Sequence, residues 1–298
     1  MDFLNDFIGN ELNEEHRPTT SRQSTSSNDK ILSVLSDMMF ANGDSMNPRP
    51  ECVAFMHDLL KEQLLLAINQ AKEYADLRKE QNFKFSDLLH CFRRHPYFSC
   101  RFIKYVSDRL TLTSLGSFDG ASPGLDGLQH SHKQHADIEQ FKSAFKDLDE
   151  DGNLSALIDQ CLEPEYNDLV KQERQARMVE FTKQMDNDAY NLFAKARRRC
   201  LCYTFDRHVS KPFVEWIGKS NLDSYSVLIL NFLATEVVAQ MVENARLTQF
   251  EVLKHQGQIL SEHTIPVELL HYKNALRRNL GYQTSGNLLF GYVGVFVN

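Results

Sequence analysis

Apolar residues recur at helical spacing from residue 29 onward, and they divide the first part of the chain into short and long helices. The first short helix should end at the turn Gly43-Asp44, because glycine accepts the backbone angles that stop a helix. Pro50 then suits the first turn of a second helix. The apolar face of the first helix comprises Ile31, Val34, Leu35, Met38 and Met39.

The second helix is predicted to be long. Apolar residues recur every three or four positions over 53–74, which gives about seven turns and a length of roughly 40 Å. The tripeptide at 83–85 then alternates like a very short strand. A third, short helix should contain Leu88 and Leu89, and a further amphipathic helix is expected over 98–112.

The same order of elements returns in the second half of the chain. A short helix should end at Gly218, and Asp223 can cap a second long helix that runs to about Lys254. A short extended piece at 264–265 precedes a final short helix that begins at Pro266. The second half therefore repeats the first: short helix, long helix, short strand, short helix.

The two units also share a short sequence: Asp-Leu-Leu-His at 87–90 matches Glu-Leu-Leu-His at 268–271, 181 positions later. A long helix flanked by two short ones cannot cover its own apolar stripe, so each unit needs a partner. Two units in one chain can cross long helix on long helix, with the short strands paired near the loops. We therefore predict an all-α protein with two histone folds paired intramolecularly; an irregular helical bundle is the alternative. The expected pairing core comprises Met38, Met39, Leu60, Leu64, Leu88, Leu89, Trp216, Leu230, Val237, Met241, Leu269 and Leu270.

Composition places boundaries around these two units. Residues 1–28 end in a polar run and should form a disordered tail, although the apolar residues of its first dozen positions could form a short partner-binding helix. We expect the first histone fold over 29–113, a flexible and then acidic linker over 114–188, and the second fold over 189–281. Residues 282–298 are left as a C-terminal tail.

Overall composition narrows the class of protein. The chain has 298 residues, 42% of them hydrophobic, which is enough for a real core. Its net charge of −7 offers no excess positive field for DNA or an anionic membrane. The apolar stretch at 226–241 is interrupted by polar residues and the N-terminus lacks a signal-peptide pattern, so we expect a soluble intracellular protein. Six cysteines without a CxxC pair indicate reduced thiols.

Charge is unevenly distributed along the chain. Residues 146–188 contain twelve acidic and five basic side chains, whereas 189–220 carry a net charge of plus five. Such asymmetry is typical of solvated helix faces that can meet each other or a partner. The densest basic group comprises Arg197, Arg198, Arg199, Arg207 and Lys211.

Two parts of the chain resemble known families. The motif Asp-Met-Met-Phe-Ala-Asn-Gly-Asp at 37–44, followed by the long helix and by Arg93-Arg94, is similar to the histone-fold subunit of about eighteen kilodaltons in TFIID. The second half resembles the Spt-three family, the two-histone-fold subunits of the SAGA co-activator. That resemblance rests on the segments 170–174, 213–217, 232–242 and 275–278. It covers roughly 29–112 and 138–280, and it leaves 113–137 and 288–297 without a counterpart.

The resemblance implies a nuclear, non-enzymatic transcription co-activator subunit that contacts TATA-binding protein and helps deliver it to RNA polymerase II promoters. Its implied partners are TATA-binding protein and other SAGA histone-fold subunits, with no cofactor. On the second long helix, Glu236, Gln240 and Glu243 form one polar stripe that could meet a basic protein, or could be an ordinary solvated face. The alternative function is a DNA-binding histone-fold transcription factor, but the neighbouring acidic segment leads us to expect no direct DNA contact.

Two local motifs suggest metal binding, and we assign neither. The acidic run at 147–155 is close to a calcium-binding EF-hand loop, but its twelfth position is Ile158 instead of the closing glutamate. The histidines at 130, 132 and 135 lack a completing ligand set nearby. GxSxG, HExxH, Walker and GxGxxG motifs are all absent from the sequence, so we predict neither a catalytic nor a metal site.

Overall fold

The first repeat unit forms three helices in the order that its sequence predicts. In the computed structural model, α1 spans Ser27–Ala41, α2 spans Pro50–Leu77 and α3 spans Phe85–Leu89, which continues as the 3₁₀ turn His90–Phe92. The structure describes residues 27–116, 126–163, 165–183, 185–202, 207–219, 222–256 and 265–291. The expected N-terminal tail therefore lies outside the described residues, apart from its last two positions.

The second unit repeats this arrangement, with a shorter first helix and longer second and third helices. Helix α9 spans Arg207–Ile217, α10 spans Ser224–His255 and α11 spans Leu269–Arg278, followed by α12 at Leu280–Ser285. The Asp223 carboxylate caps α10 by accepting the Ser226 backbone N–H at 2.8 Å. Helix α10 is long and apolar enough to cross a membrane, but 83% of its most apolar stretch is buried in the fold, as expected of a core helix.

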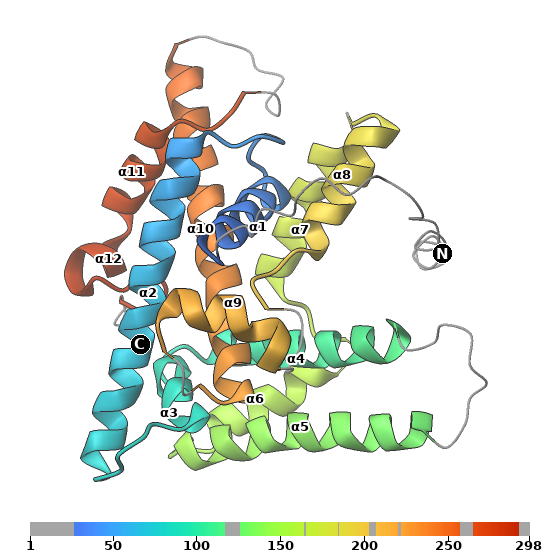
Figure 1. The fold of residues 1–298 in the computed structure, drawn as a ribbon, viewed down its shortest axis with the longest axis vertical. Helices are drawn as coiled ribbons and strands as arrows, with labels where there is room; N and C mark the ends of the chain where they lie inside the picture. The colour runs from blue at the N-terminus through green and yellow to red at the C-terminus, as the bar shows by residue number, and fades with distance from the viewer. Residues whose placement is uncertain are drawn as a thin grey trace, which may run out of the picture.

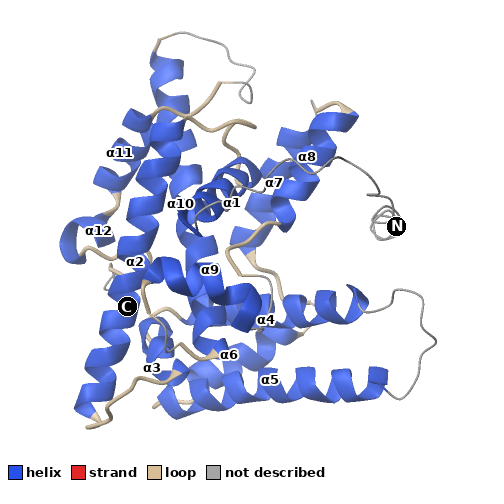
Figure 2. Cartoon of the chain, viewed as in Figure 1, coloured by secondary structure: helices blue, strands red, loops and turns tan. Residues whose placement is uncertain are grey.

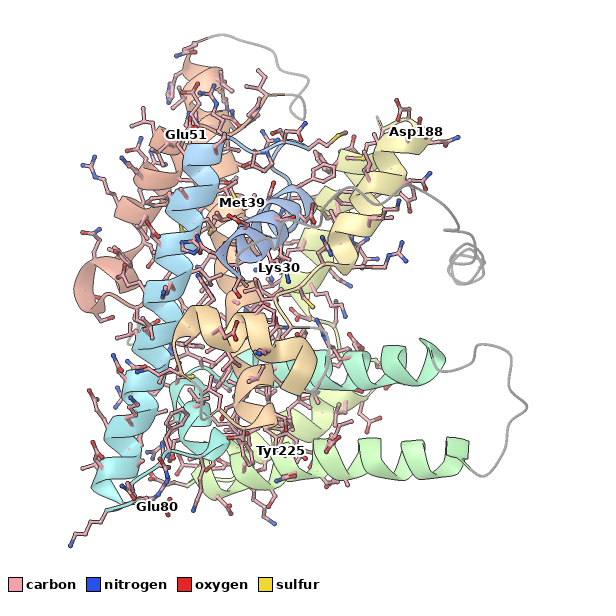
Figure 3. The ribbon with its side chains drawn as sticks, viewed as in Figure 1. Lys30, Met39, Glu51, Glu80, Asp188 and Tyr225 are labelled. Carbon is pink, nitrogen blue, oxygen red and sulfur yellow. The ribbon has the colours of Figure 1, made fainter. Side chains whose placement is uncertain are left out.

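The two units pair through their long helices. Helices α2 and α10 run beside each other along the longest axis of the molecule, with α1 and α9 packed against them (Figure 1). One continuous core contains residues of both units. Met39 of α1 is one of these core residues (Figure 3). The described residues contain helices and loops but no strand (Figure 2). Of the short strands expected at 83–85 and 264–265, residues 83–84 and 265 are loop, Phe85 begins α3, and residue 264 lies outside the described residues. The fold class is thus two histone folds paired within one chain.

The expected pairing residues lie in this core, with two exceptions in α11. Leu269 is half-buried, and Leu270 is 61% exposed. The equivalent N-cap residues are Lys84 for α3 and Glu268 for α11, and these are 184 positions apart, three more than the matching letters suggested. The letter match equates Leu269 and Leu270 with Leu88 and Leu89, whereas both residues lie in the first turn of α11, directly after its N-cap. In α11 the inward positions are instead His271, Tyr272 and Ala275.

The segment expected to link the two folds is largely helical. Helix α5 spans Asp126–Leu148 and α6 spans Asn153–Leu162. Both pack on α4 (Pro96–Gly116), the helix expected over 98–112, beside the lower half of α10 in Figure 1. Residues 117–125 lie outside the described residues. Phe141 and Phe145 of α5 are fully buried against Phe102 of α4. An aromatic stripe of this kind stabilises a helix that the polar composition of the segment conceals.

Two further helices precede the second fold. Helix α7 spans Leu169–Thr182 and α8 spans Asn187–Arg198, and they form a small second core with α1. That core contains Phe40 of α1, Phe181 of α7 and Phe193 of α8, whose rings meet edge to face. The acidic part of the expected linker therefore ends in two helices that pack on the first fold.

After α12 the chain packs back on the first fold. The Gln63 side chain of α2 donates to the Gly286 carbonyl at 2.8 Å and accepts the Leu288 N–H at 2.8 Å. The ring of Phe290 contacts Phe92 and Phe98. The described part of the expected C-terminal tail thus contributes to the structure, while 292–298 lie outside it.

Candidate partner-binding surface

A buried carboxylate joins the two folds at one end of the pair. Asp44 is fully buried, and its Oδ1 accepts the backbone N–H groups of Ser45 at 2.7 Å and Val267 at 3.0 Å. Its Oδ2 accepts the Tyr272 hydroxyl at 2.7 Å. Burial and the Asp44 carboxylate raise the pKa of Tyr272 well above its usual value, so this hydroxyl stays a donor. These hydrogen bonds join the loop after α1 to the start of the last helix of the second fold, whereas short paired strands were expected to join the two folds.

Arg246 of α10 ties the same loops together. Its guanidinium donates to the Gly43 carbonyl of the first fold and, at 3.0 Å, to the Ile265 carbonyl of the second. Gly43 has a φ of 107°, a conformation that suits glycine and ends the turn after α1. The loops that precede α2 and α11 are therefore both fixed to α10.

The sequence-predicted stripe lies on that outer face. We call Glu236, Gln240 and Glu243 the acidic stripe. The Glu236 side chain is only 9% exposed, and its Oε2 accepts from Arg101 of α4 at 3.0 Å. The Glu243 side chain is 20% exposed. The helical spacing therefore gives the correct relative positions of these residues, but neither glutamate is an open, solvated group.

Helix α7 covers the acidic stripe. Arg174 donates from Nε to Glu243 at 2.7 Å and from its terminal nitrogen to both oxygens of Glu236 at 3.1 and 3.2 Å. Arg177 lies 3.0 Å from the same Glu243 oxygen. Burial lowers the pKa of Arg174, but the two glutamates more than offset this, so its pKa is raised and the cation persists. We call Arg174 and Arg177 the arginine clamp.

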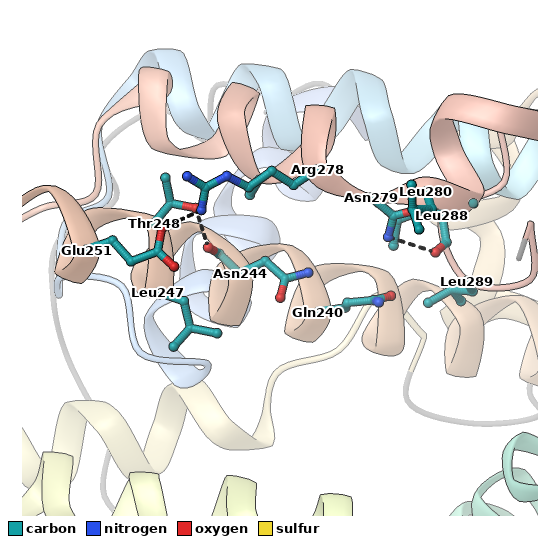
Figure 4. A pocket seen from close by; sticks show the side chains of 12 residues that line it. Gln240, Asn244, Leu247, Thr248, Glu251, Arg278, Asn279, Leu280, Leu288 and Leu289 are labelled. Carbon is teal, nitrogen blue, oxygen red and sulfur yellow. Dashed lines mark hydrogen bonds and ion pairs between the residues drawn. The ribbon is translucent and has the colours of Figure 1, made fainter. Parts of the chain in front are cut away.

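Gln240, between the two glutamates, faces a groove beside the stripe. The groove has a volume of about 440 Å³ and lies between α10 and the α11–α12 segment (Figure 4). Its walls include Leu247 and Leu280, each 60% exposed. The buried Oε1 of Gln240 has no hydrogen-bond donor among the described residues. The surface thus combines acidic, amide and apolar groups on one face of α10.

The groove lacks the chemistry of an active site. Its charged lining residues, Glu251 and Arg278, form an ion pair with each other (Figure 4). Thiols with strongly shifted pKa values lie elsewhere, in the core: burial raises the pKa of Cys52 to about 12.

The acidic run at 147–155 serves as a helix cap. The Asp149 carboxylate accepts the Ser155 N–H at 2.8 Å, and hydrogen bonds from this and neighbouring backbone groups lower its pKa. Glu150 pairs with Arg93, and Ile158 is buried in the core. Among the side chains that the structure describes, no group of three or more metal-ligating residues occurs. The side chains of His130, 132 and 135 lie outside that set.

The basic group around α8 has partners within the chain. Arg199 donates to Asp37 of α1 at 3.0 Å, and Arg197 lies over the Phe193 ring at 5.9 Å. Lys211 is 3.8 Å from Glu215 on α9. The side chain of Arg207 lies outside the described residues. Part of this positive charge is therefore neutralised internally, as the charge pattern suggested.

Two comparisons with known proteins bear on this architecture. Residues 30–114, which contain α1 to α4, match the family described as transcription initiation factor IID, 18kD subunit. The chain is also 25% identical over 224 residues to the SAGA complex subunit Spt3 of Schizosaccharomyces pombe, covering 71% of this chain and 70% of that protein. Both matches agree with the resemblances found in the sequence.

Proposed function

We propose that this Spt3-like chain is a nuclear subunit of a SAGA-type co-activator complex, which contacts TATA-binding protein and helps deliver it to RNA polymerase II promoters. The relative of known function is named as a SAGA subunit, and it aligns with most of this chain. The histone-fold family match adds a second link to transcription factors. The chain would act as an adaptor and not as an enzyme.

One structural observation carries this proposal: each histone fold covers the apolar face of the other. The apolar faces of α2 and α10 are buried in a shared core, so the pair needs no second chain to cover them. We assign assembly with other histone-fold subunits of the complex to surfaces outside this core. This division between an internal core and an external contact face is typical of an adaptor.

The proposed contact for TATA-binding protein is the acidic stripe. Glu236 and Glu243 already hold guanidinium groups at hydrogen-bond distance, so the stripe recognises cationic side chains. A basic surface of TATA-binding protein would make contacts of the same kind.

Direct binding tests the proposal. Full-length chain is titrated with TATA-binding protein and, separately, with duplex DNA at low and moderate salt. We expect binding to the protein, weakened at least about tenfold by Glu236→Gln/Glu243→Gln, since hydrogen bonds to charged groups are lost. The matched control, Glu73→Gln/Glu139→Gln, removes the same charge from exposed sites and should change affinity less than about twofold. Salt-sensitive DNA binding without affinity for TATA-binding protein would favour the DNA-binding alternative.

A further inference from the structure

Helix α7 is held to the molecule mainly by charged contacts. Of its fourteen residues only Phe181, near the C-terminal end, is buried. On the N-terminal side the chain is anchored by Tyr166, which packs on the main core beneath Lys104. Met178 is half-buried and packs with Phe181 on the small second core, whereas Leu169, Val170 and Val179 of α7 are exposed. Between its two apolar anchors, α7 therefore depends on polar side chains for its position.

Those polar side chains are concentrated on the acidic stripe. The arginine clamp makes three hydrogen bonds from Arg174 and one ion pair from Arg177, all to Glu236 and Glu243. The remaining tie, Lys171 to Asp108 at 3.1 Å, joins two side chains that are each more than half exposed. Exposed pairs contribute little to stability, so the clamp is the main restraint on the middle of α7.

The clamp has a specific geometry. Arg174 and Arg177 are three positions apart, hence on one face of a helix, and both reach Glu243. Arg174 also reaches Glu236, which lies seven positions before Glu243 on α10. The stripe thus accepts a helix that presents two arginines one turn apart.

We propose that α7 is an internal stand-in for a partner helix: in the free chain its arginines occupy the acidic stripe, and a partner that presents two arginines one helical turn apart binds there by displacing α7. This inference rests on the proposed function of the stripe as a contact surface. Segments with few buried side chains open locally at low cost, and α7 fits that description. The Phe181 anchor keeps the displaced helix attached.

Hydrogen exchange on the full-length chain tests the clamp. In Arg174→Gln/Arg177→Gln, amide exchange over 169–178 should accelerate at least about tenfold, while α10 stays protected. The control, Lys171→Gln/Lys183→Gln, removes the same charge from α7 and its C-cap residue and should change exchange less than about twofold. Unchanged exchange in the clamp variant, or equal acceleration in the control, would overturn the proposal.

A peptide of residues 168–183 then serves as the probe for the opened stripe. It should bind the clamp variant at least about tenfold more tightly than the wild type, whose stripe is occupied. A peptide with both arginines changed to glutamine should not bind. Equal affinity for wild type and clamp variant, or binding of the glutamine peptide, would contradict the displacement of α7.

TATA-binding protein in the same assay separates this inference from the proposed function. A higher affinity for the clamp variant than for the wild type supports both. Unchanged affinity overturns the inference and leaves the function in place. If neither chain binds TATA-binding protein while the peptide behaves as expected, the stand-in role of α7 holds and the proposed partner is wrong.

Discussion

Asp44 concentrates the junction of the two folds in one side chain. It has no exposed surface and satisfies two backbone N–H groups and the Tyr272 hydroxyl. A buried donor left without an acceptor is costly, and removing the carboxylate would strand three of them. Neither hydrophobic periodicity nor letter matching marks such a residue, because its role depends on contacts 223 and 228 positions away.

Asp44→Ala should therefore lower the free energy of unfolding by about 3 kcal/mol or more, because three donors lose their acceptor. Tyr272→Phe removes one of these hydrogen bonds and should cost about 1 kcal/mol. Urea denaturation followed by circular dichroism measures both. A loss below about 0.5 kcal/mol for Asp44→Ala would contradict the role given to this carboxylate.

His271 is predicted to make stability depend on pH. Burial lowers its pKa, and its neutral Nδ1 accepts the Glu268 N–H at 3.2 Å. Below the ordinary histidine pKa of 6.5 the unfolded chain takes up a proton that the folded chain resists, so stability falls as pH drops from 7 toward 5. Half-buried His90 and His95, whose pKa values are also lowered by desolvation, act in the same direction.

His271→Gln should reduce this pH dependence, because glutamine cannot be protonated and can still accept a hydrogen bond near the helix N-terminus. The measurement is the urea midpoint at pH 7 and pH 5 for both chains. We expect the wild type to lose more stability than the variant. An identical loss in the two proteins would show that His271 is not responsible.

At the scale of elements, α3 and α11 show what a repeated sequence can and cannot predict. The repeat correctly indicates that both helices exist, since capping residues and apolar spacing are local signals. The repeat misplaces the residues of α11 by three positions, because the similar tetrapeptides at 87–90 and 268–271 lie at different distances from the N-caps of their helices. In α3 the leucines at 88 and 89 are buried, whereas Leu270 is exposed.

This register predicts unequal costs for two similar substitutions. Leu89→Ala removes a fully buried side chain and should lower the free energy of unfolding by about 2–5 kcal/mol. Leu270→Ala changes a side chain in solvent and should cost about 0.5 kcal/mol or less. Chemical denaturation of both variants decides between registers, since comparable losses would place Leu270 in the core after all.

The missed helices of the linker have a similar explanation. Residues 114–188 contain five glycines and sixteen acidic side chains, and composition is averaged over both faces of a helix. Phe141 and Phe145 are spaced by four and mark the buried face of α5. Likewise the net acidity of 146–188 hides that Arg174 and Arg177 point at the acidic stripe. Which face meets which neighbour depends on tertiary packing, so the sequence predicted the stripe but not its cover.

For the whole molecule, the main consequence is that pairing of the folds is intramolecular. A core shared by α2 and α10 within one chain makes unfolding a unimolecular event. The urea midpoint should therefore be independent of protein concentration from about 0.5 to 50 μM, whereas histone folds that pair between chains are stabilised by concentration. A midpoint that rises with concentration would contradict the pairing described here.

The proposed role of this chain is that of an adaptor subunit in a SAGA-type complex. The most direct test is to purify the tagged full-length chain from nuclei of its own cells under moderate salt and to identify stoichiometric partners by mass spectrometry. The account predicts that it co-purifies in one large assembly with other histone-fold subunits of a SAGA-type complex. Recovery as a free chain, or in an assembly without those subunits, would contradict it.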